Sequence, residues 1–222
     1  MSGARPLVIL GTGGNALDVL DIAAALGAAW RVMGFLDDAL PPGSEQDGFP
    51  VLGRLDEAAR LAGPGGTLAE ALFLNAIGSE RNHAARPSIV ARTGLPAKRF
   101  ATLVHPAAGV SSRASLGRGC CIGFGACVGG RTRIGDHAWV GPGCVIGHDS
   151  VLEPFALMAP RATISGFVRL GTGSYVGSGA TVRQRVTVGA NALVGLGAVV
   201  LHDVAPGTVV VGNPARELKR HA

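Results

Sequence analysis

Histidine is followed directly by aspartate twice in this chain, at His148-Asp149 and at His202-Asp203. Imidazole titrates near neutral pH and can take a proton from an attacking group. A carboxylate beside it can fix its tautomer and raise its basicity. Each pair is therefore a candidate general base. Of the other histidines, we expect His105, beside Pro106, to pack at a domain junction and His137 to lie in a turn.

The elements that must position these pairs follow from a six-residue repeat that runs from Val110 to Val200 without insertion. All 16 positions at this spacing are Val, Leu, Ile or Met, and ten of them are followed directly by Gly. The residue four places after each is always Ala, Cys, Ser, Thr or Val. A period of six excludes an amphipathic helix and a simple half-buried strand. It predicts triangular coils of three hexads, each with a short strand, in which every aliphatic residue points inward at a corner.

A coil of three hexads distinguishes the two histidine–aspartate pairs. Gly130 and Gly166 stand one coil before and one coil after His148, which predicts a gap on both sides of its imidazole. The backbone N–H of Gly166 could then meet an oxyanion. His202 has Gln184 one coil before it and lies near the end of the repeat. We therefore expect His148 to be the base and Asp149 to orient it. The alternatives are that His202 is the base or that neither pair is catalytic.

The first hundred residues predict a small α/β unit. An apolar run at 7–10 breaks at the glycine-rich turn 11–16, a helix follows to Gly27, and a second strand at 30–36 ends at Asp37-Asp38. This is the order of a Rossmann-type unit with G-x-G-x-x-A in its turn, where backbone N–H groups bind phosphate. Alternatively, the turn binds no phosphate and serves only to pack the helix on the sheet. A helix at 55–61, a strand at 72–78 and a helix at 80–92 would complete the unit, which suits a mononucleotide.

Composition and charge narrow the ligand class. No run of about 18 apolar residues is present, so we expect no membrane span. Gly11 to Gly14 interrupts the N-terminal apolar stretch early, so we expect no signal peptide and a cytoplasmic location. Residues 1–104 carry a net charge of −1 and residues 105–222 a net charge of +6. The arginines are scattered singly, which disfavours binding of nucleic acid. They either bind a small polyphosphorylated ligand or are solvent-exposed residues of turns. The four cysteines lack zinc-site spacing, so we expect no metal, and we do not expect Cys144, at an inward position, to be a nucleophile.

The repeat resembles that of the hexapeptide-repeat acyltransferases. With the N-terminal unit, the chain resembles the sialic acid O-acetyltransferase-like family, which includes bacterial nucleotide-sugar 4-amino N-acetyltransferases. The segments that carry the resemblance are Gly11 to Ala16, Gly34 to Asp38, Ala76-Ile77-Gly78, His105-Pro106, Ile146 to Asp149 and Gly212 to Ala215. The resemblance implies a Rossmann-like α/β domain at 1–104 and a left-handed parallel β-helix at 105–222. It also implies a homotrimer with active sites in clefts between adjacent prisms.

The resemblance further implies direct acetyl transfer from acetyl-CoA to the amino group of a nucleotide-linked amino sugar, for polysaccharide synthesis. His148, Asp149 and the N–H of Gly166 would be base, orienter and oxyanion donor. The expected substrate contacts are Gly11, Gly13, Gly14, Asn15, Asp37 and Asp38. The expected CoA contacts are Gly143, Gly166, Arg183 and Arg185, with Lys219 and Arg220 as further candidates. Several relatives have His where this chain has Asn15. An O-acetyltransferase, and a non-catalytic or metal-binding trimer using His137 and His148, remain alternatives.

Overall fold

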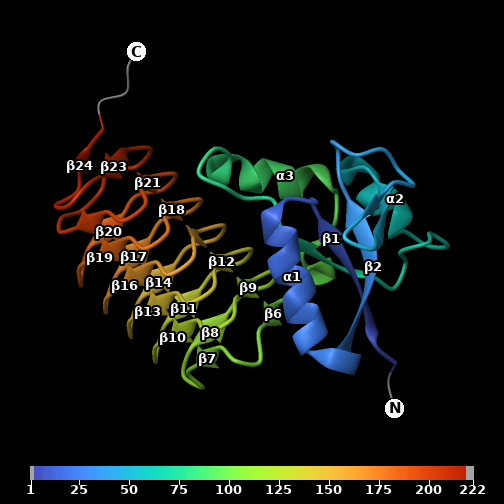
Figure 1. Ribbon diagram of the computed structural model, residues 1–222, viewed down its shortest axis with the longest axis horizontal. Coiled ribbons are helices and arrows are strands. Elements are labelled where there is room, and N and C mark those ends of the chain that lie inside the picture. Colours follow the sequence, from blue (N-terminus) through green and yellow to red (C-terminus); the bar gives the residue numbers. More distant parts are fainter. Residues whose placement is uncertain (1–2, 219–222) are drawn as a thin grey trace.

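The computed structural model describes residues 3–218, which form an α/β part lying beside a long solenoid (Figure 1). The α/β part has one sheet of five strands in the order β3-β4-β2-β1-β5. Its strands are β1 (Arg5–Leu10), β2 (Trp30–Leu36), β3 (Glu45–Gln46), β4 (Phe49–Gly53) and β5 (Leu72–Asn75). Its α-helices are α1 (Gly14–Ala25), α2 (Ala58–Leu61) and α3 (Arg86–Arg92). Short 3₁₀ turns lie at Gly27–Ala29, Leu55–Glu57, His83–Ala85 and Ala97–Arg99.

Strand β1 lies between β2 and β5 in this sheet and is buried on both faces. Leu7 and Ile9 pack in one cluster with α1, whereas Val8 and Leu10 pack in another with α2 and α3. Successive side chains of a strand point to opposite faces, so a continuous apolar run is what a two-sided layer needs. The predicted Rossmann-like order of strand, glycine-rich turn, helix and strand is confirmed.

Three predicted elements of the α/β part are shorter than the sequence suggests. The segment at 55–61 is a 3₁₀ turn followed by a single helical turn, and the helix expected at 80–92 begins only at Arg86. Pro87 occupies the first turn of α3, where its missing N–H costs nothing and its fixed φ suits the helix start. The strand expected at 72–78 ends at Asn75. The residues that follow it therefore form an open loop beside the glycine-rich turn.

The solenoid is a parallel β-helix with three faces, and successive coils contribute short strands, most of them of two residues, to these faces. The first face contains β7 (Gly109–Val110), β10 (Cys127–Val128), β13 (Val145–Ile146), β16 (Thr163–Ile164), β19 (Thr181–Val182) and β22 (Val199–Val200). The second contains β8 (Ser115–Leu116), β11 (Arg133–Ile134), β14 (Val151–Leu152), β17 (Arg169–Leu170) and β20 (Thr187–Val188). The third contains β6 (Leu103–Val104), β9 (Cys121–Ile122), β12 (Trp139–Val140), β15 (Leu157–Met158), β18 (Tyr175–Val176), β21 (Leu193–Val194), β23 (Val209–Val211) and β24 (Arg216–Glu217).

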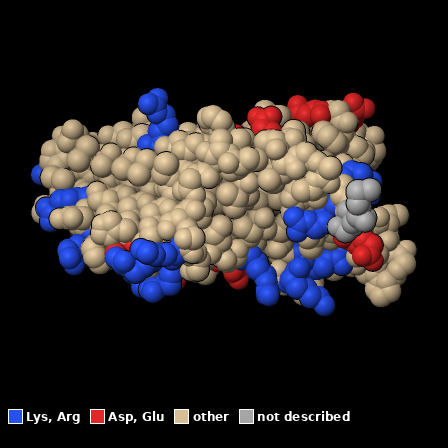
Figure 2. Space-filling model, turned by 90° about the horizontal axis from the view of Figure 1, so that it is seen from below, with Lys and Arg blue, Asp and Glu red and all other residues tan. Residues whose placement is uncertain are grey.

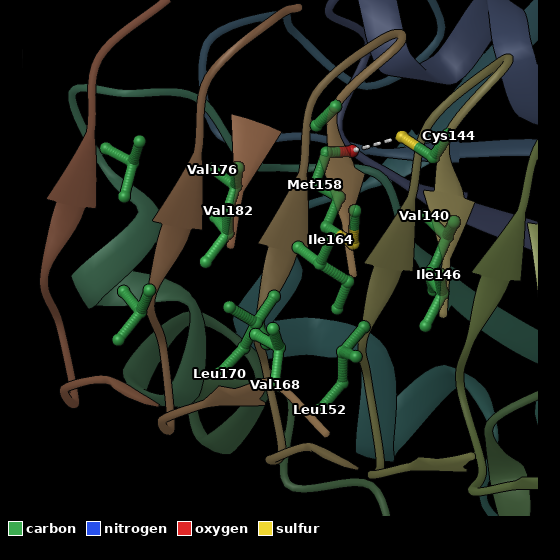
Figure 3. Packing of buried hydrophobic residues seen from close by; sticks show 14 of the residues in the cluster. Val140, Cys144, Ile146, Leu152, Met158, Ile164, Val168, Leu170, Val176 and Val182 are labelled. Atoms are coloured by element: carbon green, nitrogen blue, oxygen red, sulfur yellow. Dashed lines mark hydrogen bonds between the residues drawn. The ribbon is translucent and has the colours of Figure 1, made fainter. Parts of the chain in front are cut away.

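The interior of the solenoid is a stack of aliphatic side chains, as the repeat predicts. Figure 3 shows members of this stack, such as Ile146, Ile164 and Val182, which follow one another along the first face. Register is kept because each strand pairs with the strand one coil away, for example Ile146 with Ile164. One detail of the prediction is wrong. The aliphatic residues lie within the strands, and the small residues, such as Cys144, follow the corner turns.

Most corner turns place one residue in the left-handed region of backbone space. Glycine supplies it at several corners, for example at Gly143 with φ 66°. Elsewhere larger residues adopt it, among them Arg131 at 59°, Asp149 at 60° and Phe167 at 61°. A β-carbon is disfavoured in this conformation, so these side chains are held at a conformational cost. Such conformations occur more often at functional sites than elsewhere.

The α/β part is fixed to the third face of the solenoid. Trp139 and Leu157 point outward from that face and join the cluster that also contains α1. Arg86 is buried at the junction, where its guanidinium donates hydrogen bonds to the backbone carbonyls of Ile77 at 3.2 Å, and of His137 and Phe155 at 2.8 Å each. Burial lowers the pKa of Arg86 to about 10. The antiparallel pair β23–β24 covers the C-terminal end of the solenoid.

Candidate functional site

His148 and Asp149 occupy the corner turn at 147–150, which joins the first face to the second. We call this corner, with the turns stacked above and below it, the histidine edge. Nδ1 of His148 lies 2.7 Å from Oδ2 of Asp149. An ionised carboxylate can only accept, so Nδ1 carries the proton of the neutral ring and Nε2 keeps its lone pair. The His148 side chain is 60% exposed, which leaves Nε2 accessible as a base.

Arg131 completes this pair, although no motif in the sequence singles it out. Its Nε lies 2.6 Å from Oδ1 of Asp149, and a second guanidinium nitrogen lies 2.7 Å from Oδ2. The hydrogen bonds from Arg131, and then that from His148, hold the pKa of Asp149 well below its ordinary value. Asp149 is therefore an ionised carboxylate throughout the neutral range. The available signal was the spacing of one coil between Arg131 and Asp149.

Gly166 lies one coil above His148 and is in contact with its ring. A β-carbon at position 166 would lie 3.0 Å from Cε1 and 3.1 Å from Nε2 of His148, closer than an ordinary contact. In the described chain, the N–H of Gly166 donates to no acceptor. Gly130, one coil below, has only Ser111 near its open side, at 3.5 Å. The sequence predicts a gap on both sides of the imidazole. Only at position 166 would a side chain collide with the ring, so only there is glycine required by His148.

Phe167 and Arg185 continue the histidine edge toward the C-terminal end of the solenoid. The ring of Phe167 meets His148 edge to face with 5.2 Å between centroids. The guanidinium of Arg185 lies 4.5 Å above the Phe167 ring, a cation–π contact. Beyond it, Arg183, Arg185 and His202 line a hollow of about 590 Å³. The edge thus leads from an imidazole to a basic hollow. Lys219 and Arg220 lie outside the described residues.

The second histidine–aspartate pair does not form an equivalent arrangement. Oδ1 of Asp203 accepts a hydrogen bond from the backbone N–H of Thr187 at 2.8 Å. Throughout residues 3–218, no hydrogen bond or ion pair joins the His202 ring to the Asp203 carboxylate. His202 therefore lacks the carboxylate that would orient it.

Gly143 lies on a different corner from His148. Its turn joins the third face to the first, and its backbone N–H donates to the carbonyl of Phe124 at 2.8 Å. Within one chain, the predicted CoA contacts are therefore divided. Gly166, Arg183 and Arg185 lie along the histidine edge, and Gly143 lies along the neighbouring edge.

The glycine-rich turn of the α/β part borders a cleft of about 590 Å³. All six predicted substrate contacts line it, namely Gly11, Gly13, Gly14, Asn15, Asp37 and Asp38. Gly13 is the N-cap of α1, and neither Gly13 nor Gly14 has an atom within 4 Å of the space that a β-carbon would fill. The N–H groups of Gly13, Gly14 and Asn15 donate to no acceptor in the part of the chain described. Free N–H groups at a helix N-terminus suit an anion.

Two polar side chains of this cleft, those of Asp37 and Asn15, form hydrogen bonds that hold the glycine-rich turn in place. Oδ2 of Asp37 accepts from both the N–H and the hydroxyl of Thr12, at 2.9 Å each. Nδ2 of Asn15 donates to the carbonyl of Gly78 at 2.8 Å. These contacts tie the glycine-rich turn to the ends of the neighbouring strands. Asp37 and Asn15 are therefore first of all supports of the turn.

Asp38 lies in an ion-pair network at the margin of the cleft. Its Oδ2 is 2.6 Å from Arg92, and its Oδ1 is 3.7 Å from Arg54. Partial burial acts to raise the pKa of Asp38, but the hydrogen bonds from Arg92 and from the N–H of Leu55 outweigh it and lower the pKa. The arginines bring positive charge to a cleft whose glycine-rich turn already suits an anion.

His137 and His105 occupy different surroundings from His148. His137 lies in a turn, as predicted, but it is buried between Phe100 at 4.6 Å and Phe155 at 4.8 Å. Burial lowers the pKa of His137 to about 4. His105 meets Phe124 edge to face at 5.1 Å beside α1. His137 and His148 stand on different corners, and the described residues hold no group of three potential metal ligands.

Among residues 3–218, none of the helices has the length and apolar character needed to span a lipid bilayer.

Comparison with known proteins identifies relatives of this arrangement. A family profile described as the PglD N-terminal domain matches residues 6–91. The acetyltransferase domain of PglB from Neisseria gonorrhoeae FA1090, solved with acetyl coenzyme A, is 34% identical over 97% of this chain and 100% of that chain, with a TM-score of 0.82. PerB from Caulobacter crescentus, solved with CoA and GDP-perosamine, is 29% identical over 98% and 100%, with a TM-score of 0.83.

WeeI from Acinetobacter baumannii AYE is 24% identical over 96% of this chain and 99% of that chain, with a TM-score of 0.81, and shares the fold. No curated protein matches the sequence. Since the PglB domain matches nearly the whole chain at this level of identity, the resemblance inferred from the repeat and the glycine-rich turn is confirmed. The chain belongs to the hexapeptide-repeat acetyltransferases that include the PglB acetyltransferase domain, with a Rossmann-like N-terminal domain before a left-handed parallel β-helix.

Proposed function

We propose that this protein transfers the acetyl group of acetyl-CoA directly to the amino group of a nucleotide-linked amino sugar. The observation that carries this proposal is the pairing of His148 with Asp149 on the same edge as a basic hollow. The relatives support both substrates, because the PglB domain was solved with acetyl coenzyme A and PerB with CoA and GDP-perosamine. Nucleotide sugars and CoA are both used in the cytoplasm, so we also propose that location.

In the proposed reaction, the amine nitrogen attacks the thioester carbon while Nε2 of His148 takes the proton that the nitrogen loses. A carbon–nitrogen bond forms and the carbon–sulfur bond breaks. The imidazolium then returns the proton to the leaving thiolate, so that CoA leaves as a thiol. The unused N–H of Gly166 is the proposed donor to the oxygen that becomes negative in between. Asp149 holds the ring in the tautomer that this cycle needs.

Direct transfer is preferred to an acyl-enzyme because the buried cysteines of the solenoid are poor nucleophiles. Burial raises the pKa of Cys144 to about 12 and that of Cys120 to about 11, and it also raises that of Cys121. A thiol must ionise to attack a thioester. Cys127 is exposed, but it points from the first face and lies away from the turns of the histidine edge.

We propose that CoA lies along the histidine edge. Arg183 and Arg185 line the hollow beyond Phe167 and offer two cations to the phosphates of CoA. The thioester would then reach back past the Phe167 ring to Gly166 and His148. Gly143 could contact the same cosubstrate only if it were contributed by a second copy of the chain, because it lies on another corner.

We propose that the nucleotide of the sugar substrate binds in the cleft of the α/β part. Gly13 and Gly14 place free N–H groups and the N-terminus of α1 where a diphosphate would lie. Gly11 has φ 92° and packs on Ile77, so its role is to let the turn form. We divide the chain accordingly into a nucleotide-sugar domain at 1–104 and an acetyl-transfer domain at 105–222.

Assembly as a homotrimer is part of this proposal, since one chain does not bring its two substrate regions together. The α/β part covers the third face, whereas the histidine edge is the corner opposite that face. A second copy could place its cleft against this edge. The first face is suited to such a contact, because its outward residues are small and uncharged. Those residues are Gly109, Cys127, Val145, Thr163, Thr181 and Val199. The solenoid half presents a broad area without charged side chains in Figure 2.

The proposal is tested by mixing the protein with acetyl-CoA and each of the UDP-, GDP- and dTDP-linked amino sugars, and by measuring free thiol. We expect thiol release with at least one of them, and a His148→Ala variant slower by roughly 10²-fold or more. His202→Ala is the matched control; because His202 borders the hollow proposed for CoA, it is assayed at saturating acetyl-CoA, where kcat should be retained. A sialic-acid-like hydroxyl acceptor is assayed in parallel, and thiol release with that acceptor alone would replace the proposal with O-acetyl transfer. Absence of turnover with all acceptors would leave a non-catalytic prism.

A further inference from the structure

Four side chains form a column along the histidine edge at intervals of one coil. Arg131, Asp149, Phe167 and Arg185 each occupy the left-handed position of its turn, with φ between 59° and 64°. Equivalent turns bring Arg131 into contact with Asp149, and Arg185 into contact with Phe167. Three members already have a place in the proposed function. Arg131 does not, although it makes the closest contact in the column.

Arg131 and His148 meet on the same carboxylate. The guanidinium binds both oxygens of Asp149, at 2.6 Å and 2.7 Å, and Nδ1 of His148 binds Oδ2 at 2.7 Å. The side chain of Asp149 is only 18% exposed, whereas that of Arg131 is 63% exposed. The carboxylate therefore lies between a guanidinium on one side and an imidazole on the other.

We propose that Arg131 is a positioning residue for acetyl transfer, which fixes the plane of the Asp149 carboxylate so that Oδ2 faces Nδ1 of His148. This inference rests on the proposed function of His148 as the base. The carboxyl group of a free aspartate rotates readily about its last bond, and a single hydrogen bond from an exposed imidazole constrains it weakly. A guanidinium that binds both oxygens in one plane removes this freedom. Lysine, with a point charge, cannot do the same.

The charge of Arg131 has a second effect, on the protonation of the imidazole. Asp149 is the charged group in direct contact with His148. Arg131 lies behind Asp149, Arg185 lies behind the Phe167 ring, and Arg183 lies in the hollow beyond. Without Arg131, the negative charge of Asp149 is less compensated and favours the imidazolium form. A base must be neutral to accept a proton. Loss of Arg131 is therefore expected to move the acid limb of the pH–rate profile to higher pH.

The test compares Arg131→Met and Arg131→Lys with Arg133→Met. Arg133 belongs to the same coil and is exposed on the second face, and no carboxylate in residues 3–218 pairs with it. Thermal unfolding first establishes that each variant is folded. We expect kcat to fall roughly tenfold in Arg131→Met and less in Arg131→Lys, with KM for acetyl-CoA unchanged and Arg133→Met like the parent. A millimolar guanidinium salt should restore part of the activity of Arg131→Met.

A double-mutant cycle with Asp149→Asn separates this inference from a merely structural role. If Arg131 acts through Asp149, Arg131→Met has little further effect once the carboxylate is gone. Full multiplication of the two effects, or an unmoved acid limb in Arg131→Met, would overturn the inference. His148→Ala is assayed alongside. If it remains active, the proposed function fails; if it is inactive while Arg131→Met equals the parent, only the role of Arg131 fails.

Discussion

Replacing Gly166 by alanine adds one methyl group against the imidazole of His148. The new carbon would lie 3.0 Å from Cε1 and 3.1 Å from Nε2, whereas carbon atoms in ordinary contact are about 3.5 Å apart or more. The ring must therefore move by about 0.5 Å, and the free direction is away from the turn that carries the N–H of Gly166. Such a shift also strains the 2.7 Å hydrogen bond from Nδ1 to Asp149. We expect kcat to fall about tenfold to a hundredfold.

The chain offers a matched control for this substitution at Gly130, one coil below His148. A β-carbon at 130 would meet only the hydroxyl of Ser111, at 3.5 Å, and neither glycine has a positive φ. Both alanine variants should therefore fold with similar stability. The assay is thiol release at saturating acetyl-CoA and acceptor, with thermal unfolding of each variant. A parent-like kcat in Gly166→Ala, or an equal loss of kcat in Gly130→Ala, would refute the proposed crowding of the imidazole.

Three further predictions concern other parts of the molecule. Arg185→Gln removes the cation above Phe167, so KM for acetyl-CoA should rise several-fold with kcat nearly unchanged; an unchanged KM would place CoA elsewhere. Arg86→Met leaves three carbonyls at the junction without their donor and should lower the free energy of unfolding by about 3 kcal/mol or more, measured in urea. The pKa of buried His137, lowered to about 4, means that the unfolded chain binds the proton more tightly. Stability is therefore kept above about pH 6.5 and lost as pH falls toward 4, by about 2 kcal/mol between pH 7 and pH 5. His137→Gln should flatten this dependence, and an unaltered pH profile in that variant would refute the assignment.

The repeat made the solenoid predictable because every hexad repeats the same physical requirement. An aliphatic side chain must fill the interior, and a small residue must follow the turn, so that one period is enough to predict the coil and the faces. The same spacing placed Gly166 over His148 correctly. The prediction that the aliphatic residues lie at the corners was wrong because a period identifies which residues point inward, but it does not say where the chain bends between them.

The position of Arg131 was readable from its spacing, but its chemistry was not. A residue one coil before Asp149 must lie beside it, and the sequence says no more than that. The contact depends on the left-handed backbone of both turns, which turns the side chains into one column. The burial of His137 was even harder to predict from the sequence. One of its two aromatic neighbours, Phe100, comes from the segment before the solenoid and is not related to it by the repeat.

The fixed junction between the two parts bears on how the proposed reaction is organised. Arg86 has no carboxylate partner among residues 3–218, yet it binds carbonyls from both parts, so it resists any sliding of one part over the other. His83 adds a second link through the carbonyl of Gly173 at 2.7 Å. A cleft held rigidly on the third face cannot swing around to the histidine edge of its own chain. In the proposed homotrimer, packing between copies would bring substrate and base together, so a protein kept monomeric by substitutions on the first face should bind nucleotide sugar without acetylating it.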